Sequence, residues 1–166
     1  MPPRRFRSSR QARGRRRQLV WAIFDQQFPA LPVGSVHTAD LLTQLELAGV
    51  SHLGITIMRT HLRMQLTNIT VPADAVPFGL VVGTAADIPT RPDPNAEFID
   101  WMWQDRYMAF EVAGADVAHN PVVTIDSRSK RRMQEIDQRY LVCVKNLTAS
   151  AAFAPRIYAR TLVALP

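Results

Sequence analysis

Residues 54–67, GITIMRTHLRMQLT, carry the clearest secondary-structure signal in the chain. From residue 58 to residue 67, mostly apolar side chains alternate one by one with polar or basic ones. Successive side chains of a β-strand point to opposite faces, so this period of two predicts a strand with one buried and one polar face. The expected buried positions are Met58, Thr60, Leu62, Met64 and Leu66, and the expected polar positions are Arg59, His61, Arg63, Gln65 and Thr67.

The flanking sequence continues the β pattern. A single short helix is predicted from HTADLLTQLELAG, with Thr38 as its N-cap and Gly49 as its stop. Because helical patterns do not follow most strands, the chain favours a β-sandwich or barrel over an α/β fold. Other strands are predicted at 19–28, 78–84, 121–127, 139–146 and 156–165, with 97–112 ambiguous between helix and strand.

The charge of the chain is concentrated at its N-terminus. Of 20 basic residues, eight arginines lie in residues 1–17, where there is no Asp or Glu. Residues 18–166 hold 12 basic and 14 acidic residues. Residues 1–17 therefore carry a net charge of +8, and the rest of the chain carries −2. Self-repelling charge with little apolar surface predicts disorder. We therefore expect a disordered Arg-rich arm over 1–18 and one folded domain over 19–166.

Arginine-rich segments are suited to phosphate, because guanidinium groups bind phosphate oxygens bidentately and stay charged. The arm therefore predicts nucleic-acid contacts that read no sequence, with a localisation signal, a membrane-surface tether and a solvated tail as alternatives. A second basic cluster follows the predicted strand 121–127. It is interpreted either as a second nucleic-acid contact or as a solvated loop. Its extended form would put residues 128, 130 and 132 on one face. The candidate nucleic-acid-binding residues are Arg4, Arg5, Arg7, Arg10, Arg13, Arg15, Arg16, Arg17, Arg128, Lys130, Arg131 and Arg132.

Two further groups of residues have more ordinary interpretations. On the polar face of 54–67, Arg59, His61 and Arg63 are expected to make surface or subunit contacts. Aromatic side chains and Met are enriched at interface centres, which makes the aromatic cluster before residue 104 a candidate subunit interface, with core packing as the alternative. That cluster comprises Phe98, Trp101, Met102 and Trp103.

Signatures of catalysis and metal binding are scarce. The seven glycines form no phosphate-binding loop, no G-x-S-x-G motif occurs, and the four histidines lack CxxC or HExxH partners. We therefore expect no enzyme activity, no cofactor and no metal. The lone Cys143, in the apolar run YLVCV, is expected to be a small buried hydrophobe. No apolar run reaches the length of a transmembrane helix, about 18 residues, so no membrane partner is expected.

Residues 122–146, VVTIDSRSKRRMQEIDQRYLVCVKN, have the order of strand, basic turn and apolar strand. Together with the Arg-rich arm and the final RIYARTLVALP (156–166), this segment resembles coat proteins of small icosahedral viruses with a single jelly roll. It is most similar to those of small circular single-stranded DNA viruses and phage-like elements. The resemblance implies a single eight-stranded antiparallel jelly-roll sandwich with one or two short helices.

The same resemblance implies the function. The chain would be a capsid protein that assembles with many copies of itself into an icosahedral shell and packages the viral genome through its arm. The genome implied is single-stranded DNA, although arginine contacts phosphate in RNA equally well. The implied location is the virion, and the host cell interior during assembly, including the nucleus for a eukaryotic host. Two alternatives remain open: a ribosomal or nucleoid type of nucleic-acid-binding protein, and an enzyme or carbohydrate-binding jelly roll.

Overall fold

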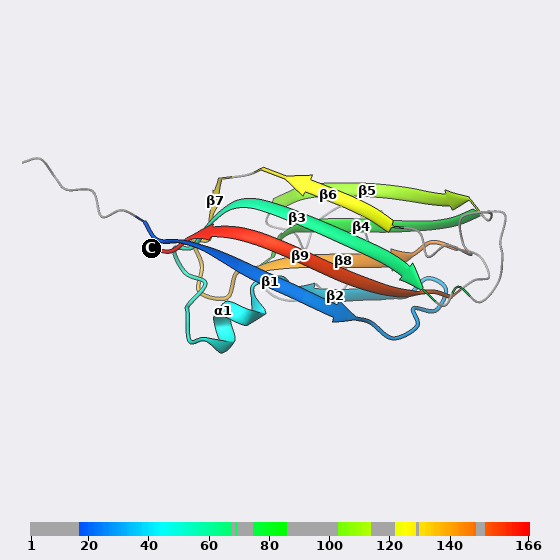
Figure 1. The fold of residues 1–166 in the computed structure, drawn as a ribbon, viewed down its shortest axis with the longest axis horizontal. Coiled ribbons are helices and arrows are strands. Elements are labelled where there is room, and N and C mark those ends of the chain that lie inside the picture. The colour runs from blue at the N-terminus through cyan, green and yellow to red at the C-terminus, as the bar shows by residue number, and fades with distance from the viewer. Residues whose placement is uncertain are drawn as a thin grey trace, which may run out of the picture.

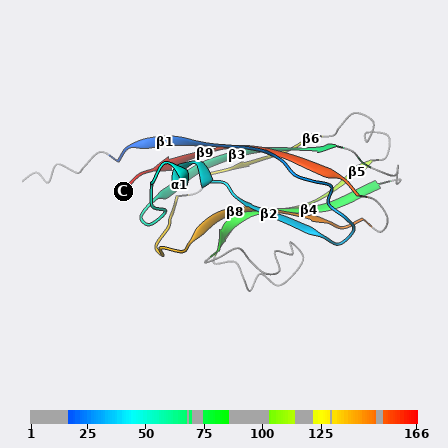
Figure 2. The same ribbon diagram turned by 90° about the horizontal axis from the view of Figure 1, so that it is seen from below.

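The computed structural model describes residues 17–67, 69, 75–85, 103–113, 122–128, 130–148 and 152–166. These residues form two antiparallel sheets that face each other as a sandwich (Figure 2). No helix among them is long and apolar enough to cross a membrane. The elements are β1 Leu19–Gln27, β2 Val36–Asp40, α1 Thr43–Leu47, β3 Thr56–Thr67, β4 Ala75–Ala85, β5 Trp103–Ala113, β6 Val122–Ser127, β7 Arg131–Arg132, β8 Arg139–Asn146 and β9 Ala154–Ala164.

The strand order is that of a jelly roll. One sheet has the order β1-β9-β3-β6, with the two-residue β7 also paired to β3, and the other has the order β2-β8-β4-β5. The chain passes from one sheet to the other between β1 and β2, β2 and β3, and β3 and β4, and the first strand lies beside the last (Figure 1). The predicted all-β jelly-roll sandwich is therefore confirmed.

The alternation in β3 places its side chains largely as predicted. Leu62, Met64 and Leu66 are buried in the core between the sheets, and Arg63 is exposed. The prediction is wrong at Met58, because the register with β9 shifts between Ile57 and Arg59. A β-bulge inserts one extra residue and reverses the alternation beyond it. Ile57 therefore enters the core, whereas Met58 is only partly buried.

The core joins the two sheets with apolar and polar contacts. The rings of Phe78 and Phe153 meet edge to face with their centroids 6.0 Å apart. A buried hydrogen bond of 2.8 Å links the Thr60 and Tyr140 hydroxyls across the sandwich. On the other side of β4 and β8, Val81, Ala85, Leu141 and Cys143 form a second buried apolar cluster. Strands buried on both faces read as continuous apolar runs, which explains YLVCV and confirms Cys143 as a buried hydrophobe.

The predicted helix is shorter than expected and begins later. Thr38 lies inside β2, where it pairs with Cys143, so the N-cap prediction is wrong. The pairing of residues 36–40 with β8 uses backbone groups that a helix would need, and this tertiary contact overrides the local pattern. The Asp40 carboxylate instead accepts the Leu42 N–H at 2.8 Å just before α1. Gly49, at φ +77°, ends the helix in the left-handed region, as predicted.

Candidate nucleic-acid interface

Three of the predicted phosphate-binding residues meet at one end of the β1-β9-β3-β6 sheet. The guanidinium Nη1 of Arg17 donates to Thr56 Oγ1 at 3.3 Å. In the ladder between β3 and β7, Thr56 pairs with Arg132 and Ile57 pairs with Arg131. Arg17 and two arginines of the second cluster therefore lie at the start of β3, although more than 100 residues of sequence separate Arg17 from that cluster.

The second basic cluster is not one continuous strand in the described part of the chain. Strand β6 ends at Ser127, which pairs with Thr60, and β7 holds only Arg131 and Arg132. Arg128 directly follows β6, and Lys130 directly precedes β7. Arg128 and Lys130 are exposed there. Of the four basic residues, Arg131 and Arg132 pair with β3, whereas Arg128 and Lys130 lie outside the strands.

The remaining predicted site residues lie outside the described part of the chain. Seven arm arginines fall within residues 1–16, and Phe98, Trp101 and Met102 fall within residues 86–102. Trp103 begins β5, of which the backbone course is described. The predicted subunit interface therefore stays a prediction.

The solvent-side surface of the β1-β9-β3-β6 sheet, here called the outer face, brings together basic residues of β3 and β9, which lie far apart in the sequence. Strand β9 alternates like β3, and its Arg156 and Arg160 point outward while Ile157 and Ala159 are buried. The ladder places Arg160 opposite His61. The spacing Arg-x-Tyr-x-Arg in residues 156–160 indicates that both arginines lie on one face of a strand. Only the pairing of β9 with β3 shows that this face continues onto β3.

Two ion pairs cross the outer face. Arg59 binds Asp126 bidentately, with Nε–Oδ1 at 3.0 Å and Nη2–Oδ2 at 2.6 Å. The hydrogen bonds from Arg59 lower the pKa of Asp126. Arg156 binds Asp25 in the same way, with both distances at 3.2 Å. Each pair joins strands far apart in sequence, β3 to β6 and β9 to β1.

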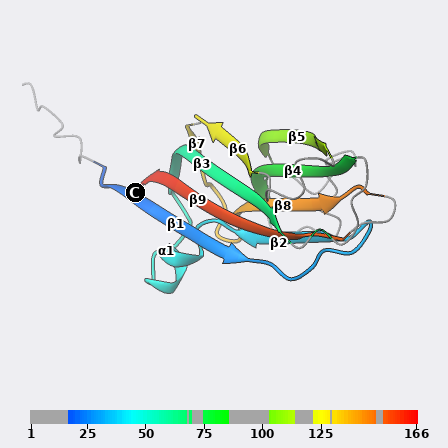
Figure 3. The ribbon, with the colours of Figure 1, turned by 45° about the vertical axis from the view of Figure 1, so that its right-hand side comes forward.

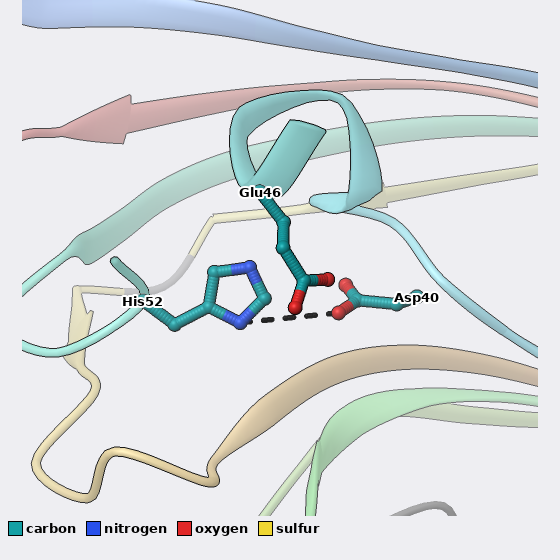
Figure 4. A group of neighbouring side chains, drawn as sticks. All are labelled: Asp40, Glu46 and His52. Carbon is teal, nitrogen blue, oxygen red and sulfur yellow. Dashed lines mark ion pairs between the residues drawn. The ribbon is translucent and has the colours of Figure 1, made fainter. Parts of the chain in front are cut away.

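A separate charged cluster lies between α1 and β8. Asp40, Glu46 and His52 present ligand-type atoms within 4.8 Å of one another (Figure 4). The nitrogen His52 Nδ1 lies 3.9 Å from Asp40 Oδ2, and the His52 side chain is buried. The sequence spacing of these residues gives no sign of the cluster, because β2, α1 and the following loop bring them together only in the fold.

Arg139 supplies a cation to this cluster. Its guanidinium atoms lie 3.9 Å from Asp40 Oδ2, 3.7 Å from Glu46 Oε1 and 3.4 Å from His52 Nδ1. Burial raises the pKa of Asp40, whereas the Leu42 N–H, His52 and Arg139 oppose the rise. The positive charge of Arg139 offsets the negative charge of the Asp40 and Glu46 carboxylates. The cluster is therefore a salt-bridge network that ties α1 to β8.

Replacement of Arg139 by Gln is expected to lower stability in a pH-dependent way. At neutral pH the loss should be about 1–2 kcal/mol, because the partly buried Asp40 carboxylate loses a neighbouring cation. The pKa of Asp40 is raised in the folded protein, so between the unfolded and the folded pKa the folded protein binds more protons than the unfolded protein. Stability therefore falls as the pH rises through the interval between these two pKa values. The Arg139→Gln deficit should therefore shrink at about pH 4. Urea unfolding at both pH values measures it.

Lys130→Gln is the matched control for that experiment, since Lys130 is exposed and is not a member of the cluster of Asp40, Glu46, His52 and Arg139. It should change the free energy of unfolding little at either pH. An Arg139→Gln deficit that is equal at both pH values would contradict the role assigned to Asp40.

Comparisons with known proteins give structural likeness only. No family model matches the chain, and no curated protein sequence matches it. A structure of empty heads of turnip yellow mosaic virus has a TM-score of 0.45 at 15% identity and covers 90% of this chain and 81% of that one. The structure of Desmodium yellow mottle tymovirus has a TM-score of 0.43 at 9% identity and covers 100% of this chain and 94% of that one. The structure of the tobacco streak virus coat protein dimer has a TM-score of 0.42 at 14% identity and covers 89% of this chain and 86% of that one.

Proposed function

We propose that the chain is a viral capsid protein in which residues 19–166 form the shell domain and residues 1–18 form a genome-binding arm. The observation that carries this proposal is the separation of charge, +8 in residues 1–17 against −2 in the rest of the chain. A nucleic-acid-binding protein of the ribosomal or nucleoid type usually spreads basic residues over its folded body as well. A near-neutral jelly roll with a polycationic arm suits packing against identical copies while the arm binds phosphate.

The geometry at the start of β3 supports the same proposal. Arg17, Arg131 and Arg132 continue the charge of the arm onto the folded domain, so a nucleic acid bound by the arm would also meet the sheet end. Single-stranded DNA is the genome we propose, on the resemblance of residues 122–146. In a shell, many arms act together, and multivalent binding strengthens each contact. The protein would then reside in the virion.

Electron microscopy and sedimentation of the purified full-length protein test the proposal. We expect closed particles of uniform diameter that contain nucleic acid protected from added nuclease. Digestion of the extracted nucleic acid with DNase or RNase, in separate reactions, identifies the genome type. Monomers that bind nucleic acid without forming particles would instead support the ribosomal or nucleoid type of protein.

A further inference from the structure

The outer face of the β1-β9-β3-β6 sheet has an excess of positive charge outside the arm. Its outward-pointing strand residues include four arginines, at 59, 63, 156 and 160, and two carboxylates, Asp25 and Asp126. Arg59 and Arg156 are paired with those carboxylates. Among the residues that the structure describes, Arg63 and Arg160 have no carboxylate partner. The outer face is therefore complementary to a polyanion.

An exposed tryptophan lies within this basic surface. Trp21 of β1 retains 43% of its accessible surface, and the guanidinium carbon of Arg160 lies 4.8 Å from the centroid of its ring. A depression of about 380 Å³ opens between these two side chains, Arg59 and His61. We call it the Trp21 depression. Its volume lies within the range of small-ligand sites, about 300–1,000 Å³.

We propose that the Trp21 depression binds a base of single-stranded nucleic acid by stacking on Trp21, while Arg160, which has no carboxylate partner among the described residues, binds an adjoining phosphate. The proposal rests on the proposed function, since it takes nucleic acid as the partner, and it adds a site on the folded domain. Aromatic side chains bordered by arginines are the arrangement with which proteins hold single strands, because every base has a π-face. The bases of a duplex are stacked on one another and cannot reach an indole in a shallow depression.

The position of the depression agrees with this role. Strand β1 begins beside the C-terminal end of β9 (Figure 3). Trp21 follows Arg17 by four residues, so the depression lies near the end of the sheet where Arg17 contacts Thr56. A second depression of about 240 Å³, lined in part by Arg63, Arg156 and Tyr158, lies further along β3. Residues 61 and 65 of β3, one from each depression, are about 13 Å apart along the strand. A strand that leaves the arm would pass over both depressions.

Binding of three oligonucleotides to the full-length protein tests the proposal, after the protein has been dissociated and freed of nucleic acid in concentrated salt. The probes are oligo(dT), an abasic oligomer with the same number of phosphates, and a duplex. The unmodified chain should bind oligo(dT) more tightly than the abasic oligomer. Trp21→Ala should weaken oligo(dT) binding about tenfold and leave the abasic and duplex affinities unchanged. Trp21→Phe should restore most of the loss.

Ile23→Ala is the matched control, because Ile23 is also exposed on β1 and does not line the depression. It should bind all three probes like the unmodified chain. Equal binding of oligo(dT) and the abasic oligomer, or an unchanged oligo(dT) affinity for Trp21→Ala, would overturn the stacking site while leaving the capsid proposal standing. No binding to any probe would overturn both. Circular dichroism of each variant checks that the sandwich is intact.

Discussion

Replacement of the eight arginines in residues 4–17 by glutamine is expected to leave the jelly roll folded and to remove nearly all nucleic acid from the purified protein. Strand β1 begins at Leu19, after the last of these arginines, and the sheets are built from residues that follow it. Each arginine that neutralises a phosphate releases a counterion, and eight such contacts carry most of a nonspecific affinity. In a shell of about 60 copies, roughly 480 positive charges would disappear.

The measurement is the ratio of absorbance at 260 and 280 nm of purified particles, with circular dichroism and thermal unfolding as tests of folding. Replacement of the same eight residues by lysine is the control, since it keeps the charge and loses only the bidentate geometry. We expect the lysine variant to retain most of the nucleic acid. A glutamine variant that purifies with the original amount of nucleic acid would show that the arm does not package the genome.

The second large effect is expected at Asn146, at the end of β8. Its side chain is fully buried, and Nδ2 donates to the Leu31 carbonyl at 2.9 Å. The side-chain oxygen accepts from the Thr148 N–H at 2.9 Å and the Thr148 hydroxyl at 2.7 Å. One amide therefore joins the segment that leaves β1 to the segment that leaves β8, inside the protein where water does not replace a lost partner.

Asn146→Ala should lower the free energy of unfolding by about 3 kcal/mol or more, because the Leu31 carbonyl and the Thr148 donors are left buried without that partner. Such a loss is a large share of a typical stability of about 5–15 kcal/mol. Urea unfolding measures it. Thr148→Val keeps the side-chain shape and removes only the bond from the Thr148 hydroxyl to Asn146 Oδ1. It should therefore lower the free energy of unfolding less than Asn146→Ala does. An Asn146→Ala variant as stable as the unmodified chain would show that this amide does not hold the two segments together.

Burial of Asn146 also bears on the sequence Asn146-Leu-Thr, which has the form of a glycosylation acceptor. A fully buried amide that is hydrogen-bonded to Leu31 and Thr148 does not accept a glycan in the folded protein. The local sequence shows the motif, and only the tertiary contacts show that the motif has a structural role.

Several elements followed from local patterns alone. Alternation predicted the central strand β3, and an apolar run predicted β8 with its boundaries at Arg139 and Asn146. Both patterns record which side chains must leave water, and that requirement is written in each segment itself. The helix was predicted less well, because residues 36–40 pair with β8 as the strand β2. The two-residue β7 was also missed within the basic connection, since its partner in β3 lies more than 70 residues earlier.

The sequence by itself determined an all-β fold with one buried face on β3, a near-neutral body and a strongly basic N-terminal segment. Composition and periodicity are properties of neighbouring residues, so no partner strand is needed to read them. The tertiary structure alone decided that Arg17 meets Thr56, that Trp21 and Arg160 share a depression, and that Asp40 and His52 share Arg139. These contacts depend on the strand order and on the bulge at Met58, where one extra residue decides which side chains lie side by side.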